Sequence, residues 1–215
     1  MSIKKILRNI IIRSKLFYWS FFHPDNLLSF KYANKAEKIG WEFVIKEMSS
    51  YKTICELGCV NGRVIFILRE FLKNKIYIGY DLNIFAIMVA KILNYFFGKS
   101  KNSFHCKNAL FSANEDCELF ISIATLIYFS ENELRKFIRL LKCNKSFKAI
   151  MMHEIFINDK AINSKDLISG NSNIHSIAMI EKEFGKGYKV DIYRTFYSIW
   201  EKDDRISAIL SIKKI

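Results

Sequence analysis

A glycine turn followed at a distance by an acidic residue is the part of this sequence best suited to chemistry. Gly58 and Gly62 flank a turn after the β-prone run 53–57, and a residue without a side chain lets a ligand approach the backbone closely. Asp81 ends the next β-prone run, 23 residues beyond Gly58 (81 − 58). An acid about 20 residues after such a turn accepts hydrogen bonds from ribose hydroxyls, so the pattern favours a nucleoside-type ligand. The alternative is an ordinary strand–helix turn with a helix-capping aspartate.

A second group of residues suits proton transfer. His153 and Glu154 follow the apolar run 147–152 and are the best-placed candidates for an acid–base pair. Tyr128 lies in the loop after another apolar run, 119–125. A general base assists a reaction in which a hydroxyl group is the nucleophile. The alternative for His153 is a histidine whose ring nitrogens are satisfied inside the protein. His23 and His175 rank lower because their placement relative to the sheet is open, and His105, in an expected strand, is expected to be structural.

β-prone and helical segments alternate along the chain and have to position these residues. Hydrophobic periodicity predicts strands at 53–57, 76–80, 103–107, 119–125, 147–152, 188–200 and 206–212, and helices at 26–49, 63–72, 84–97, 131–141 and 173–184. Ser130 and Glu133 form a capping box at the start of one helix. The alternation predicts an α/β protein with a doubly wound, mostly parallel sheet of seven strands, helices on both faces and additional N-terminal helices. The last two strands resemble a hairpin, so the C-terminal strand is expected to be antiparallel.

Composition limits the class of protein. The chain has 215 residues, of which 51% are hydrophobic, so a packed core is feasible and wholesale disorder is excluded. The formal net charge of +13 either attracts phosphate groups of nucleic acid or of a membrane, or reflects a lysine-rich composition. Cys55 and Cys59 have no second pair at zinc-finger spacing, so no metal site is predicted and a reducing compartment is favoured.

The first 22 residues form a basic, aromatic-rich leader without an acid. Arg13 and Lys15 interrupt its apolar run, so a signal peptide is not expected. No uncharged apolar run is long enough for a membrane-spanning helix. Such a leader suits the surface of an anionic membrane, and packing against its own domain or a partner subunit is an equal alternative. We therefore divide the chain into an N-terminal leader with a helical appendage, 1–49, and a main domain, 50–215.

Residues 54–65, with the sequence ICELGCVNGRVI, resemble the first motif of class I S-adenosylmethionine-dependent methyltransferases. The usual form of that motif is an acid followed by three alternate glycines. The resemblance continues in order through Tyr80-Asp81, the segment 107–109, the segment 117–122 and the loop 126–130. It covers about residues 50–215. Val60 departs from it, because the family usually has its second glycine at this position.

The resemblance implies S-adenosyl-L-methionine as the cofactor. Asp81 would hold the ribose hydroxyls, Asn108 would contact the adenine amino group, and residues 122–125 would line the floor beneath the sulfonium. The residues implied in cofactor binding are Glu56, Gly58, Cys59, Gly62, Asp81, Leu82, Asn108, Ala109, Ser122 and Ala124.

The sequence says less about the acceptor. We expect a cytoplasmic methyltransferase, in peripheral contact with a membrane through residues 1–22, that acts on a small-molecule or lipid- or sugar-linked acceptor at an oxygen atom. His153, Glu154 and Tyr128 are its candidate catalytic residues. The chain lacks the Asn/Asp-Pro-Pro-aromatic signature and the Pro-Cys nucleophile, which disfavours methylation of nucleic-acid bases. Three alternatives stay open: an RNA methyltransferase, a non-catalytic relative suggested by Val60, and a nicotinamide-dependent oxidoreductase, whose G-x-G-x-x-G motif is absent.

Overall fold

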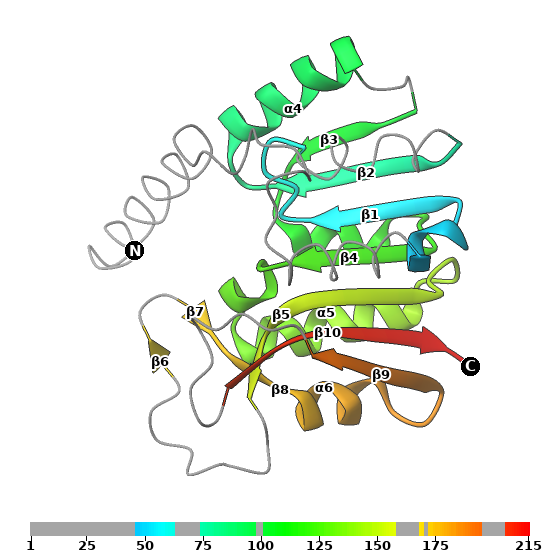
Figure 1. The fold of residues 1–215 in the computed structure, drawn as a ribbon, viewed down its shortest axis with the longest axis vertical. Helices are drawn as coiled ribbons and strands as arrows, with labels where there is room; N and C mark the ends of the chain where they lie inside the picture. The colour runs from blue at the N-terminus through cyan, green and yellow to red at the C-terminus, as the bar shows by residue number, and fades with distance from the viewer. Residues whose placement is uncertain (1–45, 63–73, 98–100, 158–167, 170–171, 195–204) are drawn as a thin grey trace.

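The computed structural model describes residues 46–62, 74–97, 101–157, 168–169, 172–194 and 205–215 (Figure 1). The leader 1–22, His23, the helix expected at 63–72 and the strand residues 195–200 lie outside the described residues. Of the helix expected at 26–49, only 46–49 are described, and they are helical. Within the described ranges, no helix is both long and apolar enough to cross a membrane.

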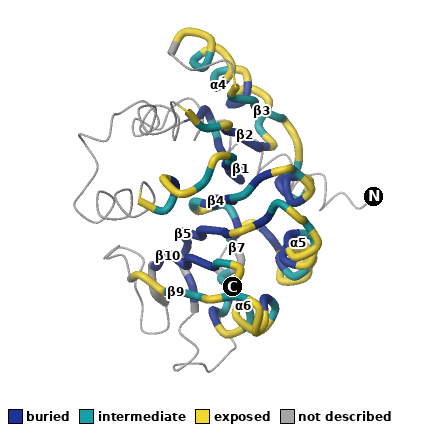
Figure 2. Tube along the Cα trace, turned by 90° about the vertical axis from the view of Figure 1, so that its right-hand side faces the viewer, coloured by how far each residue is buried: buried dark blue, intermediate teal, exposed yellow. Residues whose placement is uncertain are grey.

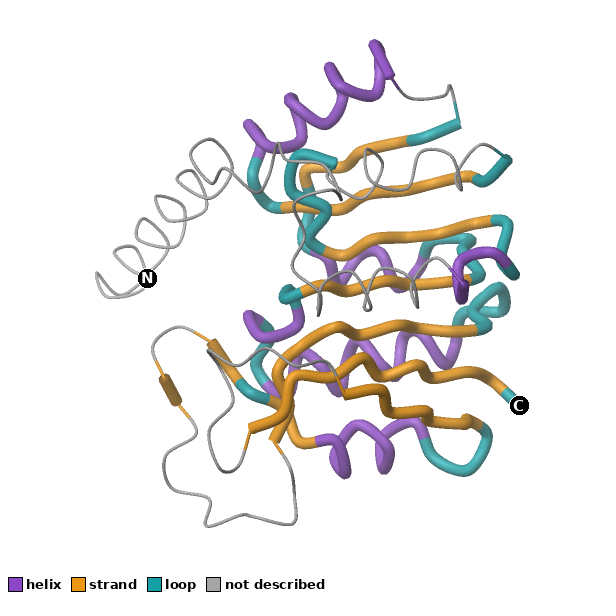
Figure 3. The backbone as a smooth tube through the Cα atoms, in the orientation of Figure 1, coloured by secondary structure: helices purple, strands orange, loops and turns teal. Residues whose placement is uncertain are grey.

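A single large sheet organises the described chain (Figures 1 and 3). Its strands lie side by side in the order β3-β2-β1-β4-β5-β10-β9, and a short strand, β8, pairs with β5. The bounds are β1 Thr53–Leu57, β2 Ile76–Asp81, β3 Ser103–Cys106, β4 Leu119–Ile123, β5 Ala149–Ile157, β8 His175–Ser176, β9 Tyr188–Arg194 and β10 Arg205–Lys214. Neighbouring strands among β1, β2, β3, β4 and β5 are parallel to each other, whereas β10 is antiparallel to both of its neighbours, β5 and β9. The predicted seven-stranded, doubly wound arrangement is confirmed.

Helices cover both faces of this sheet. They are α4 Ile84–Phe97, α5 Glu131–Cys143 and α6 Ile177–Phe184, with 3₁₀ turns η3 Ala109–Asn114 and η4 Leu126–Tyr128. Successive strand residues point to opposite faces, so each strand contributes to two cores. In β1, Cys55 joins a core with α5 and α6, while Ile54 joins one with α4. The central strands are mainly buried, and α5 and α6 lie together on one side of them (Figure 2).

Several predicted boundaries differ from the structure. The fourth strand was expected at 119–125, but β4 ends at Ile123. The fifth strand was expected at 147–152, but β5 runs from Ala149 to Ile157, because β10 pairs with it along its whole length. The helix expected at 173–184 begins only at Ile177. His175 and Ser176 are instead paired with the end of β5, and the Ser176 side chain caps the helix through the amide of Met179. A small hairpin of β6 Ile168–Ser169 and β7 Ser172–Asn173 precedes it.

Candidate functional site

The loop that follows β1 contains three residues in the left-handed region. Gly58, Val60 and Gly62 have φ angles of +70°, +48° and +79°. The amides of Gly58 and Cys59 both donate to the carbonyl oxygen of Tyr80, at 2.7 and 3.0 Å. The loop is therefore fixed to the carboxyl end of β2, the strand beside β1. On the other side of β1 lies β4, so the loop stands at the point where the strand order reverses.

Asp81 connects this loop to the start of α4. One carboxylate oxygen accepts the amide of Val60 at 3.1 Å, and the other accepts the amide of Asn83 at 2.7 Å. The side chain is 9% exposed, and this burial raises the pKa of Asp81 while its backbone hydrogen bonds act in the opposite direction. The helix cap itself is Asn83, whose side-chain oxygen accepts the amides of Phe85 and Ala86 at 3.0 and 3.2 Å. Asp81 therefore holds the glycine loop rather than capping α4.

Val60 adopts the conformation that glycine would adopt most easily. A β-branched residue at positive φ is strained, by about 1–3 kcal/mol for a non-glycine residue in this region. Because φ is nevertheless +48° at Val60, the loop keeps its left-handed turn without the second glycine. Val60 was the only feature that suggested a non-catalytic relative, and it leaves the loop left-handed at this position.

Replacing Val60 by glycine is expected to raise the free energy of unfolding by about 1 kcal/mol, since relief of the left-handed strain exceeds the extra chain entropy of glycine. Urea denaturation measures the change. Ala124→Gly is the matched control, because Ala124 has a φ of +51° but no branched side chain, and its gain should be smaller. A less stable V60G protein would show that the Val60 side chain contributes more by packing than it costs by strain.

The loop after β4 packs directly against the glycine loop. A β-carbon added at Gly58 would lie 2.0 Å from Oγ1 of Thr125, so no other residue fits at position 58 without displacing Thr125. The preceding residue, Ala124, is the second non-glycine residue at positive φ, and its amide donates to the carbonyl oxygen of His153 at 3.0 Å. Both strained non-glycine residues in the described part of the chain thus lie at the carboxyl ends of adjacent strands. Strain of this kind clusters at functional sites.

Glu154, on β5, accepts hydrogen bonds from the loop that follows β4, here called the β4 loop. Its Oε1 accepts the hydroxyl of Ser122 at 2.6 Å and the amides of Thr125 and Leu126 at 2.9 and 3.0 Å. Its Oε2 has no hydrogen-bond partner among the described residues, and the side chain is 4% exposed. Burial raises the pKa of Glu154 to about 7, against the opposing effect of these hydrogen bonds. A buried carboxyl that titrates near neutrality therefore fixes the conformation of this loop.

The placement of His153 and Glu154 just after the fifth strand was wrong. Both lie inside β5, where His153 is level with Ile123 of β4 and Ile209 of β10. Adjacent strand residues point to opposite faces, so His153 and Glu154 do not form one acid–base pair. Their individual roles remain predictions.

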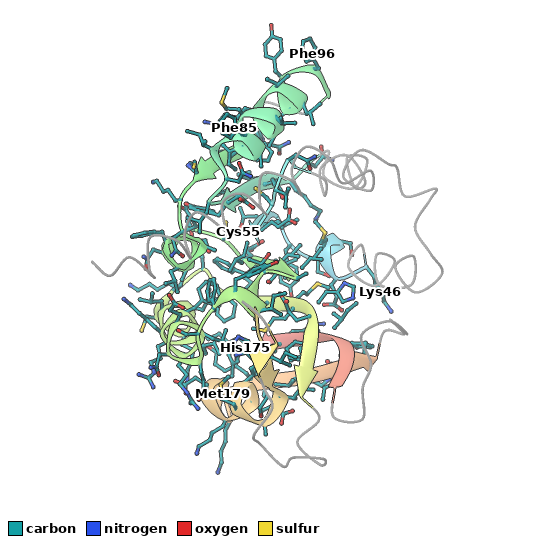
Figure 4. The ribbon with its side chains drawn as sticks, turned by 90° about the vertical axis from the view of Figure 1, so that its left-hand side faces the viewer. Lys46, Cys55, Phe85, Phe96, His175 and Met179 are labelled. Atoms are coloured by element: carbon teal, nitrogen blue, oxygen red, sulfur yellow. The ribbon has the colours of Figure 1, made fainter. Side chains whose placement is uncertain are left out.

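Two further candidate residues lie around the same loop. Tyr128 ends η4 and is 56% exposed as a residue, while partial burial and then the nearby Glu154 raise the pKa of its phenol. His175, whose placement the sequence left open, is buried beside β5, and a ring nitrogen lies 2.9 Å from the carbonyl oxygen of Leu126 (Figure 4). Burial lowers the pKa of His175, which fits a structural role in supporting η4. His105, expected to be structural, stacks on Tyr80 at 5.1 Å between ring centroids.

The remaining residues implied in cofactor binding fall into buried and accessible groups. Glu56, Cys59, Ala109 and Ser122 are buried, and burial raises the pKa of the Cys59 thiol. Glu56 accepts a hydrogen bond from the hydroxyl of Tyr77. Gly62 is also buried, whereas Leu82 is 63% exposed and Ala124 is exposed. The side chain of Asn108 caps η3 by accepting the amide of Leu110 at 2.9 Å. The carboxyl edge of β1, β2 and β4 thus gathers Gly58, Asp81, Leu82 and Ala124.

Sequence reasoning missed Asn83 and Thr125 as individual members of the site. Asn83 carried a usable signal, since an asparagine directly before an apolar helical segment is a typical N-cap. Thr125 fell within the expected floor 122–125, but nothing in the sequence links it to Gly58. That contact depends on the parallel pairing of β1 with β4.

Comparison with known proteins supports the fold. No protein-family model and no curated protein matches this sequence. Solved structures do match. Magnesium protoporphyrin IX methyltransferase (ChlM) from Synechocystis PCC 6803 with bound S-adenosylmethionine is 14% identical, with a TM-score of 0.62 over 100% of this chain and 98% of that chain. The same enzyme with bound S-adenosylhomocysteine gives 15% identity and a TM-score of 0.64 over 99% and 100%.

A third match is the O-methyltransferase from the trans-AT PKS multienzyme of Brevibacillus brevis in complex with S-adenosyl-L-homocysteine. It is 9% identical, with a TM-score of 0.57 over 86% of this chain and 76% of that chain. At such identities the likeness concerns the backbone arrangement. Together with the strand order and the antiparallel β10, it shows that this chain has the class I, Rossmann-like fold of S-adenosylmethionine-dependent methyltransferases.

Proposed function

We propose that this protein is an S-adenosylmethionine-dependent methyltransferase that acts on an oxygen atom of a small-molecule or lipid- or sugar-linked acceptor. The observation that carries the proposal is the left-handed loop Gly58–Val60–Gly62, held by Asp81 at the switch point of the sheet. In doubly wound folds this position, outside the carboxyl ends of the strands, is where nucleoside-containing ligands bind.

The residues at this edge fit the cofactor. The carboxylate of Asp81 accepts the amides of Val60 and Asn83 and a further backbone hydrogen bond from Leu82, which leaves about one of its four acceptor positions for a ribose hydroxyl. The exposed Leu82, next to it, offers an apolar surface to the adenine ring. Gly58 and the backbone of its loop would hold the methionine portion. These assignments are predictions that follow from the family resemblance and are compatible with the geometry of the site.

The chain contributes mainly positioning to such a reaction. Bound S-adenosylmethionine would supply an electrophilic methyl group on its sulfonium, and in-line approach of the acceptor accounts for much of the rate. Glu154 keeps the β4 loop in place but is buried, so it reaches no acceptor in this conformation. The phenol of Tyr128 is protonated at neutral pH, as tyrosines ordinarily are, and its raised pKa extends this range, which suits a hydrogen-bond donor. His153 remains the candidate general base.

The alternatives receive less support. The non-catalytic alternative depended on Val60, which adopts the left-handed conformation of a glycine. The RNA methyltransferase relies on the net charge of +13 alone, and steep salt dependence of RNA binding would support it. The matched structures include magnesium protoporphyrin IX methyltransferase and the O-methyltransferase from a trans-AT PKS multienzyme, which supports the main proposal.

A cytoplasmic location and contact of the leader 1–22 with a membrane surface belong to the same proposal. Their support is compositional: the cysteines have no disulfide framework, and the leader carries five basic residues and no acid.

Titration calorimetry with S-adenosylhomocysteine tests the proposed function. We expect a saturable heat of binding at micromolar ligand, and no heat when NAD⁺ is titrated under the same conditions. S-adenosylhomocysteine also should raise the unfolding temperature in proportion to the logarithm of its concentration. Absence of heat at millimolar S-adenosylhomocysteine would contradict cofactor binding, and heat with NAD⁺ would favour the oxidoreductase.

A further inference from the structure

Helix α4 is apolar on both of its faces. The face toward the sheet buries Ala86, Ile87 and Ala90 at 2% exposure or less. The opposite face, here called the α4 outer face, consists of Ile84, Phe85, Met88, Ile92, Tyr95 and Phe96. An amphipathic surface helix would place polar side chains there, whereas a helix that is hydrophobic all round is normally covered on every side.

The α4 outer face is nevertheless accessible. Its six residues are between 48% and 84% exposed, and Tyr95 is the most exposed of them. In Figure 4, Phe85 and Phe96 lie along α4 as it extends beyond the edge of the sheet, with Phe96 at its far tip. Figure 2 shows the outer side of this helix mainly as exposed. A contiguous apolar surface of this kind on a soluble domain indicates a contact with a partner or a membrane.

The sequence segment that contains the α4 outer face is positively charged. From position 82 to position 114 the sequence contains Lys91, Lys99, Lys101 and Lys107 and no aspartate or glutamate. Of these lysines, Lys91, Lys101 and Lys107 are described and exposed. Apolar side chains flanked by lysines without any acid are the composition that binds anionic bilayers, since the aliphatic and aromatic groups enter the interface while the lysines meet the headgroups.

Charge also decides between the occupants of this face. The leader 1–22 is itself basic and acid-free, and so would repel the lysines around α4. A second copy of the chain in a symmetric dimer would bring two identical positive surfaces together. An anionic bilayer is complementary both to the apolar side chains of this face and to the lysines near it. We propose that the α4 outer face docks this protein onto the surface of an anionic lipid bilayer.

The position of α4 gives this contact a consequence for the site. α4 begins at Ile84, three residues after Asp81, so the apolar face starts at the same edge of the sheet as the glycine loop. Bilayer contact there would bring the carboxyl edge of the sheet close to the lipid surface. A lipid-linked acceptor in the bilayer would therefore reach the site more easily than an acceptor in bulk water. The docking itself does not depend on the proposed function.

Vesicle flotation of the full-length protein tests the proposal. Vesicles of phosphatidylcholine with phosphatidylglycerol should carry the protein, and vesicles of phosphatidylcholine alone should carry much less. Ile92→Glu should weaken binding to the anionic vesicles about tenfold or more, since it removes one inserted side chain and adds a repelled charge. Ile192→Glu is the matched control: it makes the same change at a residue with 46% rather than 53% exposure, on β9 at the opposite edge of the sheet.

The leader is identical in both variants, so a difference between them reports on α4 alone. If Ile92→Glu alters the circular dichroism of the protein, Tyr95→Glu takes its place, because Tyr95 is 84% exposed. Equal flotation of the two variants, or no flotation of the unmodified protein, would overturn the proposal. A dimer in analytical ultracentrifugation that Ile92→Glu dissociates would instead assign this face to a second copy.

Discussion

Replacing Asp81 by alanine is expected to abolish measurable binding of S-adenosylhomocysteine and to lower the free energy of unfolding by about 2–4 kcal/mol. The stability loss arises because the amides of Val60 and Asn83 lose their acceptor in a partly buried region. The binding loss has two causes, since the variant lacks the carboxylate that we propose holds the ribose and no longer fixes the glycine loop. Calorimetry measures the loss of binding, and urea denaturation measures the loss of stability.

Two variants separate these causes. Asp81→Asn retains one side-chain oxygen, so it should lose less stability than the alanine variant. Its binding of the nucleoside should nevertheless remain weak. Asp191→Ala makes the same truncation on β9, where the carboxylate pairs with Lys189 at 3.0 Å, and it should leave binding unchanged. If Asp81→Ala bound S-adenosylhomocysteine as tightly as the unmodified protein, the nucleoside site would have to lie elsewhere.

The elements around this site could be predicted because local signals mark their ends. β1 Thr53–Leu57 and α4 Ile84–Phe97 have the predicted bounds: Gly58 stops the strand, and the Asp-Leu-Asn segment precedes the helix. The capping box of Ser130 and Glu133 is also present, with the serine accepting the Glu133 amide at 3.3 Å and the glutamate accepting the Ser130 amide at 2.8 Å. Each of these signals acts over a few residues, so a sequence shows it directly.

The errors occurred where distant segments decide the structure. β5 extends past Met152 because β10, some 55 residues later in the chain, supplies hydrogen-bond partners as far as Ile157. Because β5 is longer than predicted, His153 and Glu154 lie in a strand rather than in a loop, and their side chains point to opposite faces of the sheet. The contact of Thr125 with Gly58 likewise depends on the β1–β4 pairing. The glycine loop was thus recognisable from residue types, whereas the support beneath it was not.

The contribution of Glu154 to the stability of this protein is expected to fall by about 3 kcal/mol as the pH rises from 4 to 8. Folding raises the pKa of Glu154 from 4.5 to about 7, so the folded state binds a proton that the unfolded state has already released. The stabilisation is therefore complete below pH 4.5 and is lost as the pH rises through 7. Glu154→Gln, whose amide oxygen can accept the same three hydrogen bonds, should remove this part of the pH dependence.

The difference between the two proteins isolates Glu154 from other groups that titrate in this range. Glu118 is a matched control with the opposite sign, because its hydrogen bonds to Lys148 and to the amide of Lys52 lower its pKa. Glu118→Gln should therefore change the pH dependence only below about pH 4.5. Because the Glu154 carboxylate accepts hydrogen bonds from Ser122 and from the amides of Thr125 and Leu126, its ionisation should strengthen these bonds and hold the β4 loop more firmly. After correction for the intrinsic effect of pH, hydrogen exchange of those two amides by local opening should slow above pH 7 in the unmodified protein and not in Glu154→Gln. Parallel stability curves for these two proteins would mean that Glu154 is already ionised at pH 5.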